Sequence, residues 1–123
     1  MLPITTLLAA LAAVALVGLS FSVSLKRMKA GTDIGTGDDP GLLRRIRAQG
    51  NFVEYVPLAL ILCALAEFRG ASPAALWTLA GLLVVGRAAH ATGMLSGSTP
   101  LRAIGIMATY GALLTGAVAA LSA

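Results

Sequence analysis

The stretch that decides the fold runs from Arg44 to Pro57 and reads RRIRAQGNFVEYVP. It leads three arginines, an asparagine and a glutamate directly into an apolar segment that continues to Phe68. Because a helix turns by about 100° per residue, four of these polar side chains share one helix face. They are Arg44, Arg47, Asn51 and Glu54, with Tyr55 at the edge of the face. A polar stripe that enters an apolar segment needs a partner, which is another helix, an ion or a bound molecule.

The rest of the chain is strongly apolar. Of its 123 residues, 58% are hydrophobic and 11% are charged, whereas an ordinary globular domain has about 25% charged residues. The mean hydropathy is +0.89. The apolar residues form runs of about 20, the length of helix that crosses a bilayer. We therefore predict an integral membrane protein with a single domain over residues 1–123.

Turn-forming residues divide the chain into four expected helices, which span about residues 2–25, 41–68, 73–94 and 101–121. Basic residues follow the first apolar run but do not precede it, which favours a retained helix over a signal peptide. Small residues such as Gly86 and Gly105 recur in the last two helices, and small residues allow helices to pack closely in lipid. The expected fold is an all-α, four-helix membrane bundle that is able to oligomerise.

Lysine and arginine are concentrated on one side of this bundle. The first expected loop is flanked by Lys26, Arg27, Lys29, Arg44, Arg45 and Arg47, and the third by Arg87 and Arg102. The opposite side has only Arg69. By the positive-inside rule, both basic loops lie in the cytoplasm and both termini lie outside it. Because the basic residues adjoin apolar segments, they indicate membrane orientation rather than nucleic-acid binding.

Polar residues from three helices therefore meet near the cytoplasmic face, and two interpretations are open. In the first, Arg44 and Arg45 reach lipid headgroups, Glu54 pairs with an arginine and Asn51 bridges two helices. In the second, the arginines and the amide form a pocket for a small anion, because arginine binds a carboxylate through two parallel hydrogen bonds. From the charges alone, any anionic amphiphile fits such a pocket.

Other reactive groups are few. Cys63 is the single cysteine, so it forms no intrachain disulfide, and its apolar neighbours indicate a buried, inert thiol. The aspartates between Ala30 and Pro40 lack the spacing of a calcium-binding loop. No metal site is expected.

The motif Arg44-x-x-Arg47-Ala48-Gln49-x-Asn51-x-x-Glu54-Tyr55-x-Pro57 resembles the second-helix signature of the MAPEG family, the membrane-associated proteins in eicosanoid and glutathione metabolism. The resemblance extends over the whole chain, because the four helices, the polar first loop and the arginines beside the third loop all agree with the family pattern. The chain looks most like the short bacterial members. The implied location is therefore a bacterial inner membrane, crossed by several helices.

The resemblance implies a homotrimer that binds glutathione as a co-substrate at each subunit interface, together with a hydrophobic small molecule or lipid. The glutathione-binding residues that it implies are Arg47, Gln49, Asn51, Glu54, Tyr55, Arg87 and His90. Arg102 matches the arginine that stabilises the glutathione thiolate and is the expected catalytic residue. An adjacent cation lowers the pKa of a thiol from about 8.5 toward neutrality, and the thiolate is the nucleophile.

The chain departs from the eicosanoid enzymes on its third helix, where they have tyrosines at the positions of His90 and Met94. His90 is expected either to donate a hydrogen bond to the ligand or to join two helices, whereas Met94 is expected to pack. These departures leave two functions, a glutathione transferase or peroxidase and a non-catalytic membrane scaffold. A small transporter is disfavoured, because the run from Leu2 to Leu25 has no ionisable side chain.

Overall fold

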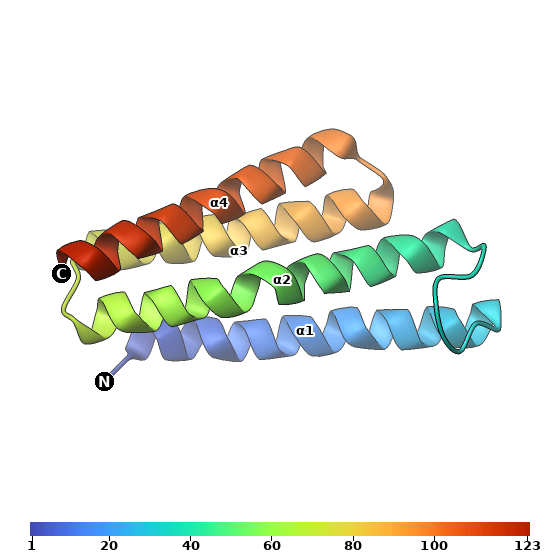
Figure 1. Cartoon of the computed structure of the whole chain (residues 1–123), viewed down its shortest axis with the longest axis horizontal. Helices are drawn as coiled ribbons and strands as arrows, with labels where there is room; N and C mark the ends of the chain where they lie inside the picture. The colour runs from blue at the N-terminus through green and yellow to red at the C-terminus, as the bar shows by residue number, and fades with distance from the viewer.

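The computed structural model describes the whole chain, Met1–Ala123, as four long helices without strands (Figure 1). The helices are α1 (Pro3–Ala30), α2 (Pro40–Phe68), α3 (Pro73–Ser96) and α4 (Thr99–Ser122). All four are long and apolar enough to cross a membrane. The predicted all-α, four-helix membrane bundle is therefore confirmed.

The chain alternates between the two ends of the bundle. Figure 1 shows both termini and the α2–α3 connection at one end, with the α1–α2 and α3–α4 connections at the other. Helix α2 lies between α1 and the α3–α4 hairpin, and α1 contacts mainly α2. All the basic side chains that flank the first and third loops are therefore on the side of the bundle away from the termini.

Helix α1 extends beyond the predicted end at Leu25 and continues to Ala30. Hydropathy marks where the apolar segment ends, whereas a helix ends where its backbone is capped. Arg27 and Lys29 lie in the last turn, where cations interact favourably with the helix dipole. Gly31 then adopts the left-handed conformation at φ 69° and its N–H donates to the Arg27 carbonyl, which ends the helix.

The first loop is joined to α1 at the start of α2. Asp39 Oδ1 accepts hydrogen bonds from the N–H groups of Gly41 at 2.8 Å and Leu42 at 3.3 Å, and its Oδ2 lies 3.5 Å from Lys26 Nζ. Partial burial raises the pKa of Asp39, but the hydrogen bonds and Lys26 outweigh it, so that pKa lies below its usual range. The contact is therefore intact at neutral pH and is lost only as the pH falls through the lowered pKa.

The other end of α1 is capped by a residue of α2. No side chain of its own caps the N-terminus of α1. Instead, the Glu67 carboxylate accepts from the N–H groups of Ile4 and Thr5, both at 2.9 Å, and from the Thr5 hydroxyl at 2.7 Å. A carboxylate at this position also interacts favourably with the helix dipole. Helix α1 is thus attached to α2 at both of its ends.

Helices α3 and α4 form the closest pair in the bundle. A Cβ atom at Gly105 would lie 2.4 Å from the backbone nitrogen of His90, and one at Gly93 would lie 2.5 Å from that of Arg102. Both distances are shorter than van der Waals contact, so only glycine allows this approach. The glycines therefore fix the position of His90 on α3 relative to Arg102 on α4.

We expect Gly105→Ala to lower the free energy of unfolding by about 1–3 kcal/mol, because the added methyl group meets the α3 backbone. Gly81→Ala is the matched control, since a Cβ there meets nothing within 4 Å. It removes a flexible glycine from the same hairpin and should be neutral or stabilising by up to about 1 kcal/mol. Unfolding in mixed detergent micelles, followed by circular dichroism, measures both. Equal stability of the two variants would contradict the close-packing account.

Candidate functional site

A polar pocket of about 580 Å³ lies between α2, α3 and α4, toward the end of the bundle that carries the basic loops. It is lined by Leu43, Arg44, Arg47, Asn51, Tyr55, His90, Met94, Thr99, Arg102, Ala103, Ile106 and Tyr110. We call it the basic pocket, because three arginines line it and no carboxylate does. Its volume lies within the range of small-molecule sites, about 300–1,000 Å³.

Five of the eight predicted site residues line this pocket. They are Arg47, Asn51 and Tyr55 from α2, His90 from α3 and Arg102 from α4. Arg44 and Met94, for which headgroup contact and packing were the simplest interpretations, line it as well. The structure thus brings together predicted site residues that are up to 55 positions apart in the sequence, from Arg47 to Arg102.

The other three predicted residues lie outside the basic pocket. Gln49 points toward α1, where its Nε2 is 3.5 Å from Ser20 Oγ. Glu54 lies 3.6 Å from Arg47 Nη2, and both side chains are about half exposed. An exposed ion pair of this kind contributes only about 0–1 kcal/mol, so it orients Arg47 without holding it tightly.

Arg87 is the third of these residues, and it is hydrogen-bonded to Asn51, which lines the pocket. Its Nη2 donates to Asn51 Oδ1 at 2.6 Å and its Nη1 to Thr109 Oγ1 at 3.5 Å. Asn51 thus bridges α2 and α3, as one interpretation of the sequence predicted. A guanidinium group has no acceptor, so the Asn51 amide must turn its oxygen toward Arg87. Its NH₂ group is then left for the basic pocket, which gains a second kind of donor for an anion.

His90 contributes a buried ring to the same pocket. Only 4% of the residue is exposed, and Nδ1 has no hydrogen-bond partner. Within one protomer, no hydrogen bond connects the ring to another helix. A buried polar atom without a partner is uncommon in proteins, and it marks a place where a ligand or water completes the bonding.

Tyr110 lines the pocket although the sequence did not single it out. Its ring meets that of Tyr55 edge to face, with centroids 5.8 Å apart and planes at 61°. Each tyrosine follows an arginine of its own helix by eight residues, Arg47 in one case and Arg102 in the other. Eight residues are about two turns, so each pair shares a face. In the sequence, this repeated spacing was the signal that could have identified Tyr110. In the structure, it places the two tyrosines about two helical turns farther along the pocket than the two arginines.

We expect Asn51→Leu to destabilise the chain by about 1.5–3 kcal/mol, because it removes the shorter hydrogen bond of a buried cation. Gln49→Leu, two positions away, loses only a contact of 3.5 Å and should change stability by less than about 1 kcal/mol. Asn51→Asp keeps an oxygen toward Arg87 and should retain stability. Unfolding in mixed micelles compares the three variants. A stable Asn51→Leu variant would show that Arg87 does not depend on this bond.

Comparison with known proteins agrees with this structure. The sequence model of the MAPEG family matches residues 5–122. Inner membrane protein YecN of Escherichia coli strain K12 is 34% identical over 111 residues, which cover 90% of this chain and 85% of the relative. The YecN protein of E. coli O6:H1 strain CFT073 matches equally well. The family match covers almost all of the four helices and includes every residue of the basic pocket, so the chain belongs to the MAPEG family.

Proposed function

We propose that the basic pocket binds glutathione and activates its thiol against hydrophobic electrophiles, so that the chain acts as a glutathione transferase or peroxidase. The observation that carries this proposal is the convergence of Arg47, Arg102 and the Asn51 NH₂ group on one pocket that no carboxylate lines. Such a pocket suits a small anion with several polar groups. Membership of the MAPEG family supports glutathione as that anion.

The proposed binding mode follows the polarity of the pocket. Arg44 and Arg47 bind glutathione carboxylates, because a guanidinium group matches a carboxylate through paired hydrogen bonds. The Asn51 NH₂ group and His90 donate to the remaining oxygens. Glu54 lies beside Arg47. When a glutathione carboxylate binds Arg47 in place of Glu54, the Glu54 carboxylate accepts a hydrogen bond from the glutathione ammonium group.

Arg102 is the proposed catalytic residue. Its positive charge, placed next to the thiol, favours the thiolate over the neutral thiol. The thiolate then attacks an electrophilic carbon, forms a C–S bond and displaces the leaving group with its electron pair. The pocket lies between helices that are apolar enough to cross the bilayer, so the proposed hydrophobic second substrate enters from the lipid.

We also propose a homotrimer in a bacterial inner membrane with both termini outside the cytoplasm. The inner-membrane location is supported by the names of the E. coli relatives, and the orientation by the arginine and lysine count. Gln49 lies outside the pocket of its own protomer, so its proposed contact with glutathione requires the pocket of a neighbouring protomer in the trimer. Arg87 contributes by orienting Asn51.

Titration of the purified protein with glutathione in detergent or lipid should show binding and an increase in thiolate absorbance near neutral pH. Arg102→Ala should abolish most of the thiolate signal, because it removes the adjacent cation. Arg69→Ala is the matched control, since Arg69 lies at the other end of the bundle and donates to the Ala123 carbonyl. Absence of glutathione binding to the unmodified protein would refute the proposal.

The second candidate is a non-catalytic membrane scaffold with the same fold. It is favoured by Met94, because a thioether lines the pocket where the eicosanoid enzymes have a tyrosine hydroxyl. Conjugation of chlorodinitrobenzene by the purified protein separates the two candidates. Turnover that Arg102→Ala lowers and Arg69→Ala leaves unchanged supports the enzyme, whereas glutathione binding without turnover supports the scaffold.

A further inference from the structure

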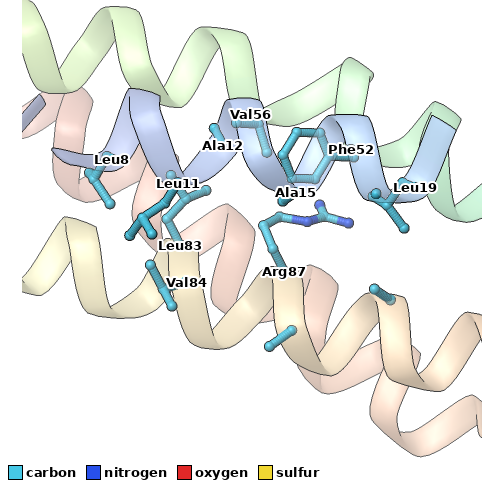
Figure 2. Close-up of a pocket in the computed structure, with 13 residues that line it drawn as sticks. Leu8, Leu11, Ala12, Ala15, Leu19, Phe52, Val56, Leu83, Val84 and Arg87 are labelled. Atoms are coloured by element: carbon cyan, nitrogen blue, oxygen red, sulfur yellow. The ribbon is translucent and has the colours of Figure 1, made fainter. Parts of the chain in front are cut away.

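A second and separate cavity lies between α1, α2 and α3. It has a volume of about 470 Å³, and eleven of its thirteen lining residues are hydrophobic. We call it the apolar groove; its walls include Leu8 and Leu19 of α1, Phe52 of α2 and Leu83 of α3 (Figure 2). No residue lines both the apolar groove and the basic pocket. The groove is therefore a distinct site and not an extension of the first.

One charged side chain lines this groove. Figure 2 shows Arg87 extending from α3 toward Phe52 and the α1 side of the groove. The residue is only 8% exposed, and its Nε has no hydrogen-bond partner. The two ion pairs of the chain are Lys26 with Asp39 and Arg47 with Glu54, so no carboxylate of the protein neutralises Arg87.

A buried cation without a counter-charge is strongly unfavourable in an apolar environment. Arg87 donates one N–H group from each terminal nitrogen, to Asn51 and to Thr109, and neither acceptor adds negative charge. Three of the five guanidinium N–H groups, including Nε–H, therefore have no partner, and Arg87 lines a cavity that is otherwise hydrophobic. The uncompensated charge of Arg87 and its unpaired N–H groups favour a ligand with an anionic group. The hydrophobic lining of the cavity favours a ligand with a hydrocarbon chain.

We propose that the apolar groove binds a single-chain carboxylate, such as an unesterified fatty acid, with its carboxylate on Arg87 and its chain along α1. A carboxylate is small enough to enter a cavity that is otherwise apolar, and it accepts from guanidinium N–H groups with good geometry. Leu8 and Leu19 are about 16 Å apart at 1.5 Å per residue, which suits an extended chain. The volume lies in the lower half of the range for one small ligand, about 300–1,000 Å³, which favours one chain over the two chains of a phospholipid.

The test uses the full chain in phosphatidylcholine nanodiscs, without glutathione, and a palmitic acid analogue that carries a photoreactive diazirine on its chain. Illumination should label peptides of α1 and α3 saturably. Palmitate should compete about tenfold or more better than hexadecanol, which has the same chain without the charge. Because glutathione is absent, the result does not depend on the proposed reaction.

Three variants locate the site. Gly18→Leu should abolish saturable labelling, because Gly18 lines the groove and a Cβ there meets nothing within 4 Å, so the larger side chain fills the cavity without a clash. Gly81→Leu is the matched control: its Cβ also meets nothing within 4 Å, but it lies outside the groove, so labelling should persist. Arg87→Met should remove the preference for palmitate over hexadecanol.

Equal competition by palmitate and hexadecanol would overturn the proposal, because the groove would then bind bilayer chains without regard to charge. Unchanged labelling of Gly18→Leu would overturn the location. Competition by lysophosphatidate as strong as that by palmitate would overturn the choice of a carboxylate. If Arg87→Met does not fold, the palmitate-to-hexadecanol ratio of the unmodified chain and the Gly18→Leu result decide the question.

Discussion

The hydrogen bond of 2.6 Å from Arg87 to Asn51 is the constraint on which the rest of the structure depends. It lies among helices that are otherwise apolar, where a guanidinium group without partners would strongly disfavour folding. It joins α2 to α3, and the close glycine contacts of α3 carry the connection to α4. It also decides which side of the Asn51 amide faces the basic pocket. The same bond therefore connects folding to the polarity of the site.

Much of the fold was predictable because the bilayer imposes simple rules on a sequence. Apolar runs of the right length, separated by Gly, Pro and Asp, identified the four helices and their order. The end of α1 was missed, because Lys26, Arg27 and Lys29 end the apolar run, whereas the helix continues through them until Gly31. The role of Glu67 was also missed, since its partners Ile4 and Thr5 are more than 60 positions away in the sequence.

The candidate site was predictable in part, because a shared helix face is necessary for a shared pocket but not sufficient. Asn51 and Arg47 line the pocket as their face required, whereas Glu54, on the same face, lies just outside it beside Arg47. The family motif includes Gln49, but this residue faces α1 and lies outside the pocket of its own protomer. Arg87 was expected to contact glutathione, whereas in the structure it lies outside the basic pocket and donates to Asn51, which lines that pocket. Tyr110 was missed, although its spacing of eight residues from Arg102 repeats that of Tyr55 from Arg47, because the two pairs meet only when α4 packs against α2.

The attachment of α1 has a mechanical consequence. Glu67 holds its first turn, and Lys26 with Asp39 holds its last turns against the start of α2, while its contact with α3 is slight. Helix α1 is thus held at both ends, and the segment between them is apolar. Because long helices curve at low cost, bending of α1 displaces its middle, near Ala15, far more than its ends. The wall of the apolar groove is therefore compliant, while the α3–α4 wall of the basic pocket, locked by glycine contacts, is rigid.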